Sequence, residues 1–288
     1  MSNLAAPLCE SAVYRDVAGA THALAGGLAC VICWRGPQKE TANEDGVALI
    51  PCGEHAAVLA VADGFGGHPA GDEASHLALE TLGERVRRAA EQGQDARLGI
   101  LDGFEQANQA IVAMGRGAAS TLAVLEVDFD HVRPYHVGDS AVLVFGQRGR
   151  MRLQTLAHSP VGYGVEAGLL AEQDALLHED RHLVSNMLGT AEMRIDVGPR
   201  LRLGSRDTAL IASDGLFDNL SIEEIVQRLR CGPLLDGVLA MAETCRQRML
   251  TPVDGRPSKP DDLTVVAFRL APPRARSGRP AAEPASLV

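Results

Sequence analysis

The chain has 288 residues, of which 46% are hydrophobic and 22% charged, with a formal net charge of −10, values typical of one globular domain or two small ones. The acidic balance and an aromatic share of 3% argue against nucleic acid as a partner, because a phosphate backbone attracts basic surfaces and unpaired bases stack on aromatic rings. No apolar run reaches the roughly 18 residues of a membrane span, and no secretion signal is recognisable, so we expect a cytoplasmic protein without a membrane partner.

In chain order, the first 20 residues show no clear periodicity. Apolar runs that predict strands follow at 28–34, 56–62, 121–127, 132–137, 141–145, 151–155, 208–212 and 263–270. Helical spacing of apolar residues covers 74–86, 98–112 and about 234–249. A further helix is predicted to begin at Ser221, where Glu224 three residues later completes a capping box.

This order of strands, then helices, then strands is typical of an α+β protein rather than of strict βαβ alternation. We find no linker or internal repeat between residues 21 and 270, so we expect a single domain there. It is preceded by a poorly defined segment, 1–20, and followed by a tail, 271–288, whose Pro-, Ala- and Arg-rich composition predicts disorder.

Cys30 and Cys33 form a C-x-x-C pattern inside the predicted strand 28–34. Residues three apart in a strand point to opposite faces, so the two thiols are not expected to share a site. We interpret them as buried free thiols, and a zinc or redox pair is the alternative.

Aspartates follow the ends of three predicted strands, each between small residues. The pattern occurs at Asp63, Asp139 and Asp214, and a reversed version places Asp261 and Asp262 directly before a strand. In an antiparallel sheet the ends of some strands and the starts of others share an edge, so these side chains can converge. Converging carboxylates raise one another's pKa unless a cation lies among them, and short oxygen ligands suit Mg²⁺ or Mn²⁺ better than zinc. Each Asp alone could be a turn or cap residue, but their shared context favours a metal site.

These residues resemble the metal-dependent protein phosphatases of type 2C, and more closely their bacterial serine/threonine branch. The matching motifs are NED (43–45), DGFGGH (63–68), ASTL (119–122), VGDS (137–140), SDGLFD (213–218) and DDLTVV (261–266), together with the segment 166–189. The resemblance extends from about Gly36 to Phe268. It depends on the order and spacing of the motifs, since no single tripeptide is diagnostic.

The resemblance implies an αββα sandwich, in which two antiparallel sheets are flanked by helices, with two Mn²⁺ or Mg²⁺ ions at one edge. It assigns Asp63 to both metals, and Asp45 with the Gly64 carbonyl to one of them. Asp214 and Asp261 would bind the other metal, which makes Asp63, Asp214 and Asp261 the expected catalytic residues.

Three further acidic residues have expected roles in the same comparison. Glu44 replaces Asp45 as a ligand if the register shifts by one residue. Asp139 corresponds to a third, weaker metal position. Asp262 is expected to support the metal ligands without binding the metal itself, or to act as a cap residue.

The implied reaction is hydrolysis of phosphoserine and phosphothreonine in proteins by a metal-activated water, with a serine/threonine kinase as the expected functional partner. No phosphoenzyme is needed, so Ser140 and Ser213 are interpreted as small turn residues rather than nucleophiles. Lys39 is the candidate for gripping the substrate phosphate, at a place where many relatives have an arginine.

Three other departures from the family pattern bear on substrate contacts. Phe65, Ala141 and Ala157 stand where His, Arg and Asp occur in relatives. These changes spare the expected metal ligands. Phe65 does not argue against activity, because bacterial members often have an apolar residue there. Ala141 and Ala157, together with Lys39 and Glu40 at the place of the expected arginine, motivate one alternative, a phosphatase-fold module with weak or no catalysis that acts in signalling or binding.

The segment HEDRH at 178–182 formally matches the H-E-x-x-H motif of zinc peptidases. Such a site needs the motif on a helix and a third ligand. Because the motif falls in the variable flap beside the expected active site, we interpret its histidines as flap or surface residues and keep the zinc peptidase as the other alternative.

Overall fold

The computed structural model describes residues 12–65 and 70–271. The predicted disordered tail therefore lies outside the described residues except for Ala271, as do residues 1–11 of the N-terminal segment and 66–69 of the DGFGGH motif. Within the described parts, the chain forms two sheets of seven and six strands, and all the strand pairs are antiparallel.

The first sheet has the order β1-β4-β5-β6-β7-β10, with β11 paired to β7. Its strands are β1 (Ala12–Tyr14), β4 (Asp45–Pro51), β5 (Ala56–Asp63), β6 (Leu122–Asp128), β7 (His131–Val137), β10 (Asp196–Val197) and β11 (Leu201–Arg202). The second sheet has the order β2-β3-β13-β12-β8-β9. Its strands are β2 (Val17–Leu24), β3 (Gly27–Trp34), β13 (Leu263–Leu270), β12 (Thr208–Ala212), β8 (Ala141–Phe145) and β9 (Met151–Gln154).

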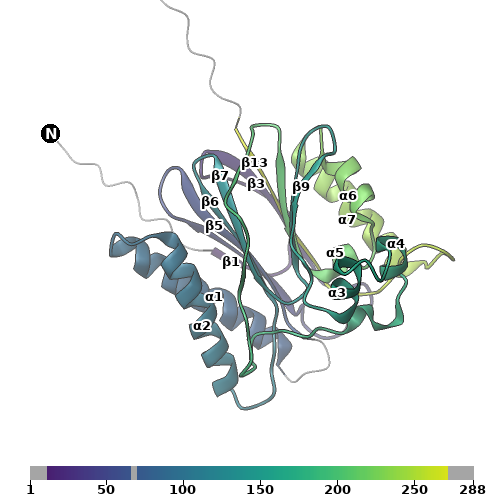
Figure 1. The fold of residues 1–288 in the computed structure, drawn as a ribbon, viewed down its shortest axis with the longest axis horizontal. Coiled ribbons are helices and arrows are strands. Elements are labelled where there is room, and N and C mark those ends of the chain that lie inside the picture. Colours follow the sequence, from purple (N-terminus) through teal and green to yellow (C-terminus); the bar gives the residue numbers. More distant parts are fainter. Residues whose placement is uncertain (1–11, 66–69, 272–288) are drawn as a thin grey trace, which may run out of the picture.

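Helices cover the outer face of each sheet, as Figure 1 shows. The first sheet is covered by α1 (Gly71–Glu91) and α2 (Ala96–Ala113). The second is covered by α5 (Asp214–Phe217), α6 (Ile222–Leu229) and α7 (Leu234–Leu250). Short helices α3 (Pro160–Glu166), α4 (Glu172–Ala175) and the 3₁₀ helix η1 (Glu179–His182) lie between β9 and β10 in the sequence. The expected αββα sandwich is confirmed.

Strand β3 shows why the layers stack in this way. Its residues are apolar on both faces, which is the pattern of a strand buried between two layers. Cys33 belongs to the core between the sheets, whereas Cys30 belongs to the core beneath α6 and α7. The two thiols therefore face opposite ways, as predicted. Burial raises the pKa of Cys30 to about 11 and that of Cys33 to about 12, so the thiolate form of both is disfavoured at neutral pH.

The predicted strands and helices are all present, and the capping box of Ser221 and Glu224 is formed. Regular structure begins earlier than expected, because β1 and the first part of β2 lie before residue 21. Strand β2 lies at a sheet edge and has mostly small residues, so its sequence carries little apolar alternation. None of the helices among the described residues is long and apolar enough to span a membrane.

Candidate metal centre

Asp45 and Asp63 face each other across the first sheet. Asp45 is the first residue of β4, Asp63 is the last residue of β5, and the antiparallel register pairs them directly. The Asp63 amide donates to the Thr121 hydroxyl (3.1 Å), and the Thr121 amide donates to the Asp63 carbonyl (2.8 Å). The Thr121 hydroxyl also lies 2.7 Å from Ser140 Oγ. The ASTL and VGDS motifs therefore hold the backbone of Asp63 in place.

Asp214 and Asp261 reach the same edge from the second sheet. Strands β12 and β13 are antiparallel neighbours, with Ala212 opposite Val265, so the end of one strand lies beside the start of the other. A Cβ added at Gly215 would lie 1.9 Å from the Asp262 carbonyl oxygen. Only glycine therefore allows the start of α5 to lie this close to the chain before β13.

The electrostatics show that five carboxylates share this edge. Burial raises the pKa of Asp63, and so do the charges of Asp45, Asp214, Asp261 and Asp139. Burial and the charge of Asp214 also raise the pKa of Asp261 to about 7 and that of Asp139 to about 8. A divalent cation bound among such carboxylates would offset their mutual repulsion and favour their ionised forms.

Asp45 provides a direct indication of fit to such a cation. Its side chain is 1% exposed, and Oδ2 accepts a hydrogen bond from Ser213 Oγ at 2.7 Å. Within the described part of the chain, its buried Oδ1 has no hydrogen-bond partner. A buried carboxylate oxygen without a partner, in a set of oxygen donors only, suits a hard metal ion such as Mg²⁺ or Mn²⁺.

The two serines beside the aspartates are fully buried, as expected for supporting residues. Ser140 and Ser213 are both 0% exposed. Ser213 Oγ also accepts a hydrogen bond from the Thr264 amide, which links Asp45 to β13. A nucleophile must reach a phosphate in solution, and neither hydroxyl is placed to do so.

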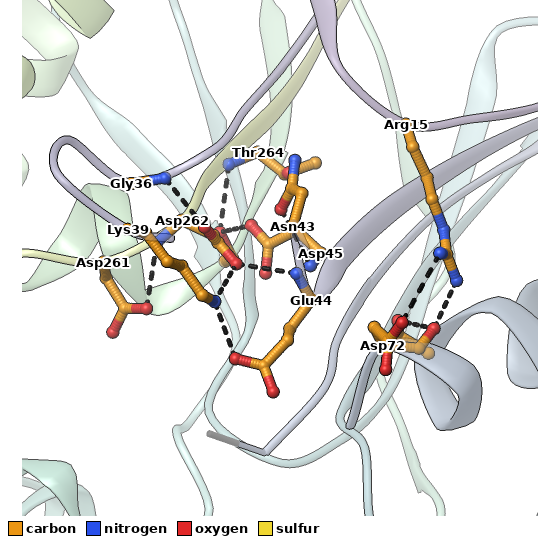
Figure 2. Close-up of polar contacts among 12 residues, drawn as sticks. Arg15, Gly36, Lys39, Asn43, Glu44, Asp45, Asp72, Asp261, Asp262 and Thr264 are labelled. Carbon is orange, nitrogen blue, oxygen red and sulfur yellow. Dashed lines mark hydrogen bonds and ion pairs between the residues drawn. The ribbon is translucent and has the colours of Figure 1, made fainter. Parts of the chain in front are cut away.

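Asp262 and Lys39 organise the loop that precedes Asp45, as Figure 2 shows. The Asp262 carboxylate accepts hydrogen bonds from the amides of Gly36 and Glu44, both at 2.7 Å, and is 2% exposed. Lys39 Nζ lies 2.6 Å from both Asp262 Oδ2 and Glu44 Oε2. Glu44 is thus paired with a lysine, while Asp45 faces Asp63. The role of Lys39 in gripping phosphate stays a prediction.

Two residues at the site were not singled out from the sequence, Lys259 and Asp218. Lys259 Nζ lies 2.5 Å from Asp214 Oδ2, 2.9 Å from Asp218 Oδ2 and 3.1 Å from Asp261 Oδ2. The available signals were the place of Lys259 two residues before Asp261 and the four-residue spacing of Asp214 and Asp218, which puts both on one side of a helical turn.

A cavity of about 530 Å³ opens beside the carboxylates. Asp139, Asp214 and Asp218 line one part of it, and apolar residues of α3 and α5, such as Val161 and Phe217, line another. The cavity therefore joins a charged end to an apolar one, between the candidate metal site and the flap.

The HEDRH segment does not form the helix that a zinc peptidase requires. His178 precedes η1 and its Nδ1 accepts a hydrogen bond from the Asp180 amide, and η1 is a single 3₁₀ turn. The two histidines of the motif therefore do not share one face of an α-helix.

A separate group, His136, His158 and Asp196, has its ligand atoms within 4.8 Å of one another. His136 Nε2 lies 2.7 Å from the Leu156 carbonyl oxygen, and His158 Nδ1 accepts a hydrogen bond from the Gly138 amide at 3.1 Å. These nitrogens already support neighbouring loops, so the group is interpreted as structural.

Comparisons with known proteins agree with this geometry. A family model described as protein phosphatase 2C matches residues 37–251. Protein phosphatase PhpP of Streptococcus pneumoniae is 32% identical over 196 residues, which cover 65% of this chain and 78% of PhpP. The Mycobacterium tuberculosis serine/threonine phosphatase PstP has a TM-score of 0.69 at 26% identity, covering 84% of this chain and 98% of PstP.

A PstP catalytic domain solved with two manganese ions has the same fold, with a TM-score of 0.63 at 24% identity over 85% of this chain and 98% of that one. The family model covers most of the chain, and its range includes Asp45, Asp63, Asp139 and Asp214. This chain belongs to the protein phosphatase 2C family.

Proposed function

We propose that this protein is a metal-dependent serine/threonine phosphatase that hydrolyses phosphoserine and phosphothreonine in proteins. The observation that carries the proposal is the convergence of four carboxylates on that of Asp63, together with a buried Asp45 oxygen that has no hydrogen-bond partner among the described residues. The manganese-containing PstP domain matches this chain at the level of fold, so the metal assignment rests on this chain's own carboxylates.

In the proposed site, Asp63 would hold two Mn²⁺ or Mg²⁺ ions, Asp45 and the Gly64 carbonyl would hold one of them, and Asp214 and Asp261 would hold the other. Asp139 is the proposed ligand of a third ion. When bound, the ions supply an activated water and stabilise charge on the phosphoryl oxygens.

The residues of the chain contribute position rather than covalent chemistry. Ser213 orients the Asp45 carboxylate, and Thr121 fixes the backbone of Asp63. The cavity beside Asp139 and Asp214 would receive the part of the substrate next to the phosphate, and its apolar end suits a peptide segment. A cytoplasmic location and a partner kinase remain predictions.

A non-catalytic binding role was the alternative suggested by the departures at Ala141 and Ala157. Membership of the phosphatase family and the retained carboxylate cluster favour the enzyme instead. The two functions differ in turnover, which is directly measurable.

The test is hydrolysis of p-nitrophenyl phosphate and a phosphothreonine peptide with Mn²⁺, with Mg²⁺, and after chelation. We expect chelation to abolish turnover and added metal to restore it. Asp63→Asn should lower turnover by at least about 100-fold, because it removes a charged ligand shared by both ions. The control Asp130→Asn, on a surface loop paired with Arg202, should leave turnover unchanged.

Melting temperature in chelator separates loss of function from loss of folding. Asp63→Asn should be at least as stable as the wild type there, because the variant removes one of several mutually repelling carboxylates. Full activity without divalent metal would contradict the proposed function.

A further inference from the structure

Lys259 lies among carboxylates that include the proposed ligands of one metal ion. Its ammonium nitrogen lies within 3.1 Å of oxygens from Asp214, Asp218 and Asp261, and its side chain is 24% exposed. Two of these three carboxylates, Asp214 and Asp261, are the proposed ligands of one metal ion. A positive charge carried by the chain itself is therefore already in contact with them.

The backbone of Lys259 is held so that this contact is built into the fold. The buried Asn219 side chain accepts a hydrogen bond from the Lys259 amide at 3.0 Å and donates one to the Lys259 carbonyl at 2.9 Å. Asn219 directly follows Asp218, so the lysine is fixed beside α5. Its four-carbon side chain retains the freedom to move the ammonium group.

An ammonium ion and a divalent metal compete for these oxygens. A Mg²⁺ ion on the Asp214 oxygen that lies 2.5 Å from Lys259 would be about 2.0–2.1 Å from that oxygen, so two positive charges would repel each other across one carboxylate. We propose that Lys259 is an internal counter-ion that holds Asp214 and Asp261 together in the metal-free protein and competes with the metal for them. This inference rests on the proposed metal site.

Asp218 is the third carboxylate in contact with Lys259. Asp218 is 8% exposed and has a second cation nearby, with Arg181 Nε 3.7 Å from Asp218 Oδ1. When metal displaces the ammonium from Asp214 and Asp261, Asp218 keeps Arg181 and remains beside the lysine. Binding of the metal ion held by Asp214 and Asp261 thus requires rearrangement of Lys259, whereas binding of the ion held by Asp45 does not.

The chain offers a matched control, because Lys39 and Lys259 are its only two lysines. Lys39 also lies against two carboxylates, Glu44 and Asp262, as Figure 2 shows. Neither of these carboxylates is a proposed metal ligand. Competition should therefore be a property of Lys259 and not of Lys39.

The first test is calorimetric titration of Mn²⁺ into metal-stripped full-length protein at fixed pH and salt. Lys259→Met should raise the Mn²⁺ affinity of the site formed by Asp214 and Asp261 about 10- to 100-fold, the equivalent of one charge-assisted hydrogen bond that no longer has to be broken. Lys39→Met should change it by less than about threefold. Lys259→Arg keeps the charge and should stay close to the wild type.

The second test is made on the wild-type chain, and variants serve only to assign its signals. Side-chain ¹³C labelling of lysine gives signals from two residues, and the signal of Lys39 is identified by its absence from the spectrum of Lys39→Met. Titration with diamagnetic Mg²⁺ should shift the Lys259 signal in step with binding, while the Lys39 signal moves much less.

The outcomes separate the inference from the function on which it rests. Equal Mn²⁺ affinity in wild type and Lys259→Met, or weaker binding in the variant, would overturn the inference alone, as would a Lys259 signal that does not move at saturating Mg²⁺. Absence of metal binding to wild type and variants alike would overturn the proposed metal site, and the inference with it.

Discussion

The Asp262 carboxylate shows how a residue beside the proposed metal ligands can position one of them through the backbone. It accepts hydrogen bonds from the amides of Gly36 and Glu44 and pairs with Lys39. The residue next to Glu44 is Asp45, so these contacts set the point at which the chain enters β4. The sequence indicated a supporting role for Asp262, but its partners lie more than 200 residues away.

Replacing Asp262 by Asn should destabilise the protein and weaken metal binding. The Asn side chain has one acceptor oxygen and no charge. The backbone N–H of Gly36 or that of Glu44 therefore loses a charged acceptor, which costs about 1–3 kcal/mol. Urea unfolding measures this change, and the exposed Asp130→Asn variant, which should unfold at nearly the same urea concentration as the wild type, is the control. Equal stability of the two variants would contradict the role assigned to Asp262.

At the scale of elements, the capping box of α6 also links that helix to α7. Glu224 accepts a hydrogen bond from the Ser221 amide at 3.1 Å, and its two oxygens lie 2.9 and 2.6 Å from Arg248 nitrogens. The capping box was visible in the sequence because its residues are three apart. The Arg248 pairing was not, since it joins residues 24 positions apart.

Glu224→Gln should lower stability at neutral pH but not in acid. Partial burial raises the pKa of Glu224, but Arg248 and the Ser221 amide outweigh it and lower the pKa below the ordinary 4.5. A carboxyl group whose pKa is lower in the folded than in the unfolded protein contributes stability that is fully present above pH 4.5. This contribution is lost as the pH falls through the lower pKa of the folded protein.

Thermal unfolding of wild type and Glu224→Gln across pH tests this. The difference in melting temperature should be a few degrees at pH 7, as about 1 kcal/mol corresponds to about 2–4 °C in a protein of this size. It should shrink as pH falls below about 4.5. A difference that is independent of pH would assign the effect to packing rather than charge.

At the scale of the whole molecule, the carboxylate cluster should make metal-free stability fall as pH rises. Burial is the main cause of raised pKa values at Asp218 (about 6), Asp261 (about 7) and Asp139 (about 8). A carboxyl group with a raised folded-state pKa favours folding at low pH. That contribution is lost as pH rises from the ordinary 3.8 through the folded-state value.

In chelator, the melting temperature should therefore fall by several degrees between about pH 5 and about pH 8.5. Saturating Mn²⁺ should remove this decline, because metal at 100 times its dissociation constant adds about 2.7 kcal/mol and binds best to deprotonated carboxylates. The Asp63→Asn variant should show a smaller decline in chelator. A metal-free melting temperature that rises over this range would be contrary to the assignment of the cluster.

The sequence by itself determined the local features of this protein: the eight predicted strands, the four predicted helices, and the small-Asp-small turns that supply the carboxylates. These depend on periodicity and turn chemistry over a few residues, and the order of the motifs was enough to indicate the family. Edge strands such as β2 were not predicted from the sequence, because small residues at a half-exposed edge leave little apolar alternation.

Only the tertiary structure decided which charges meet. The register of β4 on β5 places Asp45, rather than Glu44, opposite Asp63, and the pairing of β12 with β13 brings Lys259 onto Asp214 and Asp261. Contacts between residues tens to hundreds of positions apart depend on strand register and layer packing, because one residue of register shift turns every side chain to the other face. The sequence therefore predicted which carboxylates lie together, and the fold places Lys259 against two of them.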